Sequence, residues 1–429
     1  MTDAATSGAG DVRRRRTRWR RWEAHALVAA TAVGLVHALD ERVLRPPAGV
    51  DRGSELRWTV ALVAVLAVAV LLVRAARPAV GAVVVATLGA LFVGDGGTHV
   101  VHASSGEVDA LDVTGAAAAL AGVVLLGLAV VGAFRRSGGP RRRGWRWADR
   151  LATLLVVAVL ATFLVAPVVT GAVQVHLPRR PVAAPPSEEF LPVTLRAEDG
   201  PALQAWYRPS RNGAAVMVLN SARGDHGGSA GHARLLADHG YGVLVYDARG
   251  TGGSEGTPNG WGWTWLPDVE AGLDFLSEQP DVADGGVGLL GLSTGADVAI
   301  EAAALDPRIR AVVADGATAQ GFADRPEGWS AAVSLGPMYL AGRLLTGRSP
   351  NAPLEEAIAA VAPRPVLLVA AGSIPQEIPL NRRYEAAGAS DVELWELPDV
   401  RHTSGLTSRP EEYADRVLGL LDDALLRGR

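Results

Sequence analysis

A serine between two glycines is the first feature of this sequence that could carry chemistry. Ser293 lies in the segment 291–295, GLSTG, after an apolar run and before a helical stretch, Ala296–Ala304. A G-x-S-x-G turn from strand to helix exposes the serine hydroxyl above a sheet, because its glycines permit a tight turn and close packing. The amide groups that open the helix would also face a developing negative charge. The pattern predicts a serine nucleophile.

The elements that must position this serine alternate along the second half of the chain. Short runs rich in β-branched residues are separated by helical stretches, which predicts an α/β fold with a mostly parallel eight-stranded sheet and helices on both faces. About 240 residues are ample for one such core. The expected strands are Leu191–Leu195, Leu203–Tyr207, Ala215–Leu219, Gly242–Tyr246, Gly286–Leu290, Arg310–Ala314, Pro365–Ala370 and Val392–Leu397.

From residue 188 onward, the sequence resembles the α/β-hydrolase family, and within it the dienelactone-hydrolase-like and dipeptidyl-peptidase-like serine hydrolases. The segment 240–256, GYGVLVYDARGTGGSEG, resembles the fourth core strand of the family and the turn that follows it. Ser293 is similarly placed after the fifth strand. The resemblance implies a catalytic triad in the chain order serine, acid, histidine.

That order selects the general base and leaves the acid open. His402 is the one histidine that follows Ser293, and it comes just after the last expected strand, where the family places its base. The family usually places the acid after the seventh strand, where this chain has Pro375 at the customary position and Glu377 two residues later. Asp315, at the end of the sixth strand, is the alternative acid, as in family members that resemble lipases.

The resemblance also implies an oxyanion hole made of backbone amides. One amide would come from Thr294 and the other from the loop after the third strand, at Ser221 or Ala222. The family often has His-Gly in that loop, whereas this chain has Asn220-Ser221. Because a backbone donor does not require a particular side chain, the departure bears on the substrate class more than on the chemistry.

An apolar insertion at 316–361 is expected to cap the active site, with packing against the core as the alternative. Three tryptophans, Trp261, Trp263 and Trp265, fit either the mouth of the pocket or a membrane interface, where tryptophan is favoured. Asp247 and Arg249 are expected to hold the turn after the fourth strand and to play no catalytic part.

Composition excludes several classes of function. The 41 basic side chains are all arginine and nearly balance 45 acidic ones, so the net charge of −4 excludes a polyanion-binding character over the whole chain. The absence of cysteine excludes disulfides and cysteine nucleophiles. We expect no cofactor, no metal and no nucleic-acid partner. The arginine-rich tail, 1–21, is expected to orient the chain and contact anionic lipid.

An apolar excess before residue 176 predicts a membrane region. Residues 22–175 are expected to form about five transmembrane helices, and 176–187, with four prolines in twelve residues, an extended linker to a hydrolase domain at 188–429. The expected spans are Trp22–Leu39, Trp58–Val73, Ala79–Val93, Val113–Phe134 and Leu151–Val175. A four-span topology, without the first run, is the alternative.

Arginine placement favours the five-span topology, because basic residues in short loops stay on the cytoplasmic side. The hydrolase domain then lies outside the cytoplasm. His99 and His102 are expected in an outer loop beside Asp95, with no third ligand for a metal. For His25 and His37 we expect polar contacts between helices.

These patterns predict a multi-pass membrane-anchored serine hydrolase. It would cleave an ester, thioester or amide of a small-molecule, lipid or peptide substrate through an acyl-enzyme on Ser293. An extracytoplasmic peptidase and an acyltransferase on the same triad are the alternatives within catalysis. A membrane sensor or scaffold with a degenerate hydrolase domain is the alternative without catalysis.

Overall fold

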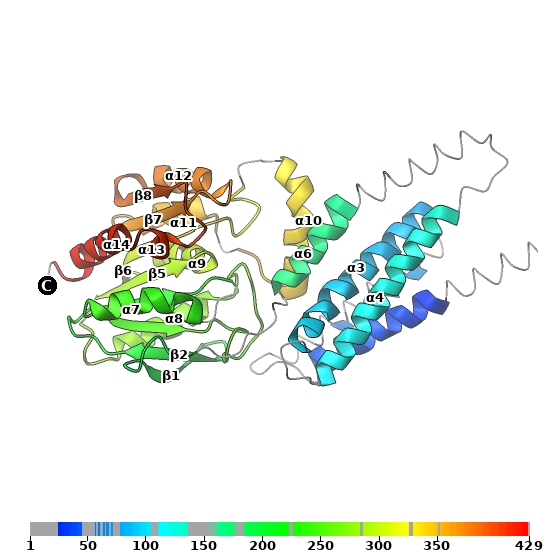
Figure 1. Ribbon diagram of the computed structural model, residues 1–429, viewed down its shortest axis with the longest axis horizontal. Helices are drawn as coiled ribbons and strands as arrows, with labels where there is room; N and C mark the ends of the chain where they lie inside the picture. The colour runs from blue at the N-terminus through cyan, green and yellow to red at the C-terminus, as the bar shows by residue number, and fades with distance from the viewer. Residues whose placement is uncertain are drawn as a thin grey trace, which may run out of the picture. The chain divides into compact units, whose positions relative to one another are not determined.

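The computed structural model divides the chain into two compact units, residues 1–46 with 51–173 and residues 47–50 with 174–429 (Figure 1). The division lies close to the expected linker. The expected tail and the arginine-rich loop after residue 135 lie outside the described residues, as does most of the linker. The structure describes residues 25–44, 78–103, 110–135, 161–175, 177, 184–222, 226–283, 286–325, 329–350 and 352–427, with isolated residues at 56–71, 155 and 159.

The second unit is built on an eight-stranded sheet in the order β1-β2-β4-β3-β5-β6-β7-β8. Its strands run parallel except β2, which is antiparallel to both β1 and β4. The predicted α/β fold and all eight predicted strands are confirmed, with ends that differ by at most two residues. The strands are β1 (Leu191–Arg196), β2 (Ala202–Arg208), β3 (Ala215–Leu219), β4 (Gly242–Tyr246), β5 (Val287–Leu292), β6 (Ile309–Asp315), β7 (Val366–Ala371) and β8 (Val392–Leu397).

Helices cover both faces of the sheet, as predicted. One face carries α8, α9, α11 and α12, and the other carries α7 and α14. Two short helices, η3 and α13, precede α7 and α14, and η4 precedes β8. The bounds are η3 (His226–Ser229), α7 (Ala230–Asp238), α8 (Leu266–Ser277), α9 (Thr294–Leu305), α10 (Trp329–Thr346), α11 (Leu354–Val361), α12 (Glu377–Gly388), η4 (Ala389–Asp391), α13 (Gly405–Ser408) and α14 (Pro410–Leu425).

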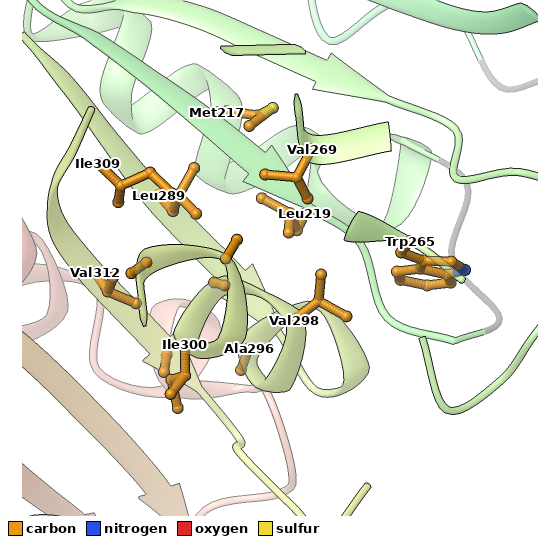
Figure 2. Packing of buried hydrophobic residues seen from close by; sticks show 14 of the residues in the cluster. Met217, Leu219, Trp265, Val269, Leu289, Ala296, Val298, Ile300, Ile309 and Val312 are labelled. Atoms are coloured by element: carbon orange, nitrogen blue, oxygen red, sulfur yellow. The ribbon is translucent and has the colours of Figure 1, made fainter. Parts of the chain in front are cut away.

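The central strands are apolar without interruption because both of their faces are buried. Met217 and Leu219 of β3 point into the layer that holds Val298 of α9, as Figure 2 shows. The alternate residues Val216 and Val218 pack in the opposite layer. Each fully buried aliphatic side chain of this kind contributes about 1.5–3 kcal/mol relative to exposure. This rigid sheet presents the carboxyl ends of its parallel strands at one edge, where we expect the site.

The first unit is helical. It holds a helix over His25–Leu39, η1 (Asp40–Leu44), α3 (Pro78–Ala103), α4 (Ala110–Arg135), η2 (Ala161–Val165) and the start of α6 (Ala166–Val175). Helices α3 and α4 are antiparallel neighbours, and their backbones approach closely at two glycine pairs. A Cβ atom on Gly96 would lie 2.1 Å from the Gly115 oxygen, and one on Gly89 would lie 2.7 Å from the Gly122 oxygen. Glycine at these four positions therefore permits the contact.

Among the described residues, one helix is long and apolar enough to cross a membrane, at Ala110–Val131 of α4. Shorter apolar helices lie at His25–Leu39, Gly81–Gly97 and Thr162–Val175. Most of the large apolar side chains that the described residues leave exposed belong to this unit, including Leu120, which is 66% exposed. The five predicted spans are not confirmed by these findings.

One sequence expectation about this unit is wrong. The predicted third span, Ala79–Val93, ends at Val93 and a loop is expected after it, yet α3 continues to Ala103. Asp95, His99 and His102 therefore lie in a helix. The glycines of the segment 94–97, GDGG, suggested a loop because glycine is a poor helix former. In the structure Gly96 permits the close approach of α4, so tertiary packing overrides the local preference.

Candidate active site

Ser293 lies at a strained turn between β5 and α9. Its backbone has φ 54° and ψ −119°, a conformation that a residue with a side chain rarely adopts. The flanking glycines are required by space. A Cβ atom on Gly291 would lie 2.2 Å from the Gly295 oxygen, and one on Gly295 would lie 2.4 Å from the Leu219 oxygen. The turn therefore has the nucleophile-elbow geometry that the G-x-S-x-G pattern predicts.

His402 faces this serine from the loop after β8. Its Nε2 atom lies 2.9 Å from Ser293 Oγ, although the two residues are 109 positions apart in the chain. The side chain of His402 is 24% exposed, so the imidazole edge remains open to solvent. Ser373 Oγ accepts a hydrogen bond from the His402 amide at 2.8 Å, which anchors the loop.

Glu377 completes a chain of three side chains. Its Oε2 atom lies 2.7 Å from His402 Nδ1, and its Oε1 atom accepts the Ala371 amide at 2.7 Å. The carboxylate is buried at the start of α12, beside the end of β7. Each oxygen of the carboxylate thus has a hydrogen-bond partner, and the two contacts orient the carboxylate toward the imidazole.

Asp315, the other candidate acid, lies close by but makes a different contact. Its Oδ2 atom accepts the Tyr413 hydroxyl at 3.1 Å. Burial raises the pKa of Asp315 to about 7. The hydrogen bond from Tyr413 lowers this pKa, the nearby Glu377 carboxylate raises it, and His402 lowers it. The open choice between the two acids is thus answered geometrically by Glu377, which is the one hydrogen-bonded to His402.

The loop after β3 lies against the elbow, where the oxyanion hole is expected. The tight approach of Gly295 to the carbonyls of Leu219 and Asn220 places this loop beside the start of α9. Asn220 is fixed in turn by its side-chain amide, which donates to the Tyr246 carbonyl at 2.6 Å. Ser221 and Ala222 follow directly and are half-buried. Their amides, with that of Thr294, remain the predicted donors.

Sequence reasoning missed a glycine that supports the histidine. Gly316, with φ +81°, follows Asp315, and a Cβ atom there would lie 2.7 Å from His402 Cε1. Thr403, the residue after the histidine, also has a positive φ of 53°. The turn after β6 therefore forms the floor beneath the imidazole. The sequence does show a glycine directly after the aspartate that ends β6. No local pattern, however, indicates that this glycine contacts the His402 loop almost ninety residues later.

Two of the three tryptophans join the elbow to the inserted segment. Trp261 and Trp263 stack with ring centroids 4.5 Å apart, and both are buried against Tyr339 of α10. Their loop is tied to the elbow because Thr294 Oγ donates to the Gly260 carbonyl at 2.9 Å. Trp265 belongs to the main core instead. All three side chains are buried, so an exposed place at a membrane interface does not describe them.

Asp247 and Arg249 hold the turn after β4, as expected. Asp247 accepts the Gly253 amide at 3.0 Å. The Arg249 guanidinium is nearly buried and donates to Asp268 and to Asp199. Paired hydrogen bonds of this kind satisfy a buried charge, which indicates a structural role.

Comparisons with known proteins identify the family of the second unit. Residues 181–391 match the family model described as X-Pro dipeptidyl-peptidase (S15 family). Protein Rv2307c of Mycobacterium tuberculosis is 34% identical over 232 residues, which cover 53% of this chain and 75% of that protein. The chain belongs to the α/β-hydrolase family. The family match covers β1 to β7, the elbow and the Glu377 turn, and it ends before β8 and His402.

Other similar proteins match a comparable share of this α/β hydrolase. YfhR of Escherichia coli is 27% identical over 244 residues, covering 54% of this chain and 81% of that protein. The esterase Pf2001 of Pyrococcus furiosus has 22% sequence identity and a TM-score of 0.47, covering 59% of this chain and 98% of the esterase.

Proposed function

We propose that this α/β hydrolase is a membrane-anchored serine hydrolase that forms an acyl-enzyme on Ser293. The contacts from Ser293 through His402 to Glu377, at 2.9 and 2.7 Å, are the observation that carries the proposal. Family membership supports hydrolysis in general. The substrate would be an ester, thioester or amide.

Each side chain has a defined role in the proposed mechanism. His402 Nε2 takes the proton of Ser293 Oγ as that oxygen attacks the carbonyl carbon, and later returns the proton to the leaving group. Glu377 accepts the Nδ1 proton, which fixes the tautomer that leaves Nε2 free and stabilises the imidazolium. The strained backbone of Ser293 holds Oγ above the sheet, so little reorganisation precedes attack.

Backbone amides would stabilise the oxyanion that attack creates. The Thr294 amide opens α9, so it combines a hydrogen bond with the positive end of the helix dipole. A second amide donor, from Ser221 or Ala222, is supported by the close backbone contact between their loop and Gly295. Water then hydrolyses the acyl-enzyme by the same proton transfers in reverse.

A serine-reactive phosphonate probe tests the proposal. We expect the full chain to be labelled at one position and the Ser293→Ala variant to lose the label. Ser404→Ala, a change at another loop serine, is the matched control and should be labelled like the unaltered chain. Full labelling of the Ser293→Ala variant would contradict the proposed nucleophile.

A peptidase is the second candidate, favoured by the match to the X-Pro dipeptidyl-peptidase model. Turnover of nitrophenyl esters, compared with that of aminoacyl-prolyl anilides, separates the two activities. Anilide turnover that exceeds ester turnover would favour the peptidase. Both activities should disappear together in the Ser293→Ala variant.

The helical unit supports membrane anchoring through its exposed apolar side chains and the apolar segment Ala110–Val131 of α4. The five-span topology, with the hydrolase unit outside the cytoplasm, remains part of the proposal. Because the chain has no cysteine, a Ser277→Cys variant carries a single thiol on the exposed end of α8. An impermeant maleimide should label that thiol in intact cells; labelling only after lysis would contradict the topology.

A further inference from the structure

Helix α10 of the inserted segment is apolar on more than the side that packs against the protein. Its 18 residues carry one charge, that of Arg343. The described residues of the hydrolase unit leave six large apolar side chains exposed, and four of these lie in the segment 316–361. A surface helix normally presents polar side chains to water, so an apolar outer face indicates a partner. The six are Leu191, Leu305, Phe322, Val333, Leu340 and Leu344.

The exposed side chains of α10 form one stripe along the helix. Val333, Leu340 and Leu344 are 52%, 56% and 56% exposed, and we call these three side chains the α10 stripe. Their spacing of seven and then four residues places them on one face of a helix with 3.6 residues per turn. Gly336 lies between the first two, and a Cβ atom there would meet no described atom within 4 Å. This face of α10 is therefore left open by the described residues.

The other side of α10 is fixed to the hydrolase unit (yellow in Figure 1). Met338 and Tyr339 are buried in a cluster separate from the two cores that cover the sheet. The same cluster holds the stacked pair Trp261 and Trp263. Because their loop is tied to the serine elbow through the Gly260 carbonyl, α10 has a firm seat beside the active site. The α10 stripe points away from that seat.

The same cluster also holds the end of an apolar helix. Gln174 and Val175 are the last residues of α6, and both belong to the hydrolase unit. Val175 is buried in the cluster, and the Gly260 amide donates to the Gln174 carbonyl at 2.7 Å. Helix α6 ends the apolar helical segment Thr162–Val175 and the predicted span Leu151–Val175. The chain thus passes from an apolar segment directly onto the surface that carries α10.

We propose that the α10 stripe lies on the lipid bilayer, in the boundary between head groups and acyl chains. The proposal rests on the membrane anchoring proposed above. A span that ends at Val175 leaves the hydrocarbon there, so the cluster packed on Val175 lies at the bilayer surface. An apolar stripe at that height exchanges contacts with water for contacts with lipid. Arg343, which is exposed in the last turn of α10, is placed to meet the head groups.

A second copy of the chain fits the α10 stripe less well than a bilayer does. A stable protein interface takes about 800 Å² and about 20–30 residues from each partner. The α10 stripe offers three aliphatic side chains on a single helix. A bilayer requires apolar area and no fixed geometry, and that is what the stripe supplies.

A single fluorescent probe in the full chain, reconstituted in vesicles of phosphatidylcholine and phosphatidylglycerol, tests the proposal. Because the chain has no cysteine, Leu344→Cys supplies one site for a nitrobenzoxadiazole probe. Lipids that are spin-labelled near the head group should quench this probe by about half or more, and lipids labelled near the chain end should quench it less, since an interfacial helix enters by only about 5–10 Å. The same probe on Ser277→Cys, exposed at the end of α8, is the control and should not be quenched.

The outcomes separate a failure of this inference from a failure of the anchoring. If the chain floats with the vesicles and the Leu344→Cys probe is shielded from water but not quenched by lipid, then protein covers the stripe and the inference is wrong, while the anchoring stands. A probe that stays in water has the same meaning. A chain that does not float with the vesicles overturns the proposed anchoring and this inference with it.

A glutamate within the stripe gives a second readout. Leu340→Glu, introduced beside the labelled Leu344→Cys, should lower the quenching by about threefold, because a charged group is costly in an apolar boundary. Leu305→Glu is the matched control and should leave the quenching unchanged, since Leu305 is 68% exposed at the end of α9, outside the inserted segment. Equal hydrolysis of a soluble ester by both variants shows that they are folded. Unchanged quenching in the Leu340→Glu variant would overturn the proposal.

Discussion

Two histidines in this molecule are each placed beside a carboxylate, but on different nitrogens. In the hydrolase unit, Glu377 meets Nδ1 of His402, and the serine hydroxyl meets Nε2. In the helical unit, a hydroxyl meets Nδ1 of His37, and Asp95 faces Nε2. The two His402 contacts are 2.7 and 2.9 Å long, whereas His37 Nε2 lies 3.8 Å from Asp95 Oδ2.

The comparison shows that a histidine–carboxylate pair has no fixed meaning apart from its other contacts. In the proposed mechanism, His402 acts as a base toward Ser293, whose hydroxyl oxygen lies 2.9 Å from its Nε2. The hydroxyl near His37, that of Thr114, also lies within hydrogen-bond distance of Asp40 Oδ2 and of the Leu111 carbonyl. The same residue types thus form the proposed catalytic site in one unit and polar contacts between helices in the other.

Removal of the carboxylate from the first pair should have the largest effect. Glu377→Gln keeps the shape but no longer stabilises the imidazolium, so we expect kcat to fall by about 10³–10⁴-fold. Asp315→Asn should lower kcat by less than about tenfold, since Asp315 contacts Tyr413 and not His402. Steady-state ester hydrolysis measures both; an equal loss in the two variants would break the assignment of the acid.

A stability measurement should sharpen the contrast between the two acids of the hydrolase unit. Burial raises the pKa of Asp315 to about 7, so the native state keeps this proton between about pH 4 and pH 7 while the unfolded state releases it. The native protein then binds more protons than the unfolded chain, and stability falls as pH rises through that window. The contribution is up to about 4 kcal/mol at about 1.4 kcal/mol per pH unit.

Asp315→Asn removes this titration, so its free energy of unfolding should depend less on pH between about 4 and 7. Denaturant unfolding of the hydrolase unit, followed by tryptophan fluorescence in the full chain, measures the slope. An unchanged slope in the variant would show that Asp315 does not carry its proton in the native state.

Displacement of the His402 ring should have an intermediate effect. A Cβ atom in Gly316→Ala would lie 2.7 Å from His402 Cε1, at a backbone φ that disfavours alanine. A shift of the ring by about 1 Å should cost about 10²-fold in kcat. Gly419→Ala, on α14 with no atom within 4 Å of the added carbon, is the matched control and should retain full activity.

The smallest expected effect concerns the packing that creates the second pair. In Gly115→Ala the added carbon would lie 2.4 Å from His99 Cβ, which pushes α3 away from α4. We expect the helical unit to lose about 1–3 kcal/mol of stability, while hydrolysis of a soluble ester changes by less than about twofold. Gly127→Ala, also on α4 but in open space, should be neutral. A large loss of hydrolysis in Gly115→Ala would show that the two units depend on each other.

Much of the hydrolase unit follows from local sequence patterns. The eight strands are short apolar runs bounded by turn residues. A strand that is buried on both faces is apolar without interruption, so a short window of sequence is enough to predict it. The elbow is also marked locally by its G-x-S-x-G pattern, although the close contact at Gly295 is made with Leu219 of β3. The order of serine, acid and histidine along the chain then left His402 as the one candidate for the general base.

The choice between acids was not local. Asp315 ends β6 and Glu377 follows β7, and the two strands end at the same edge of the sheet. Position in the sequence therefore does not decide which of the two acids contacts the histidine. Only side-chain direction separates them, since Glu377 is turned toward His402 by the first turn of α12 and Asp315 toward Tyr413 of α14. Side-chain direction depends on how helices pack on the sheet, which one segment does not encode alone.

By itself, the sequence determined the strands, the serine turn and the place of its histidine, because adjacent residues suffice to form each of these. Tertiary structure decided which acid meets His402, that α3 continues past Val93, and that His37 faces Asp95 across 58 residues of chain. These features share one physical reason. Each depends on how closely two segments that are distant in sequence approach one another. In the helical unit, close backbone contacts at glycines, such as Gly96 with Gly115, determine this approach.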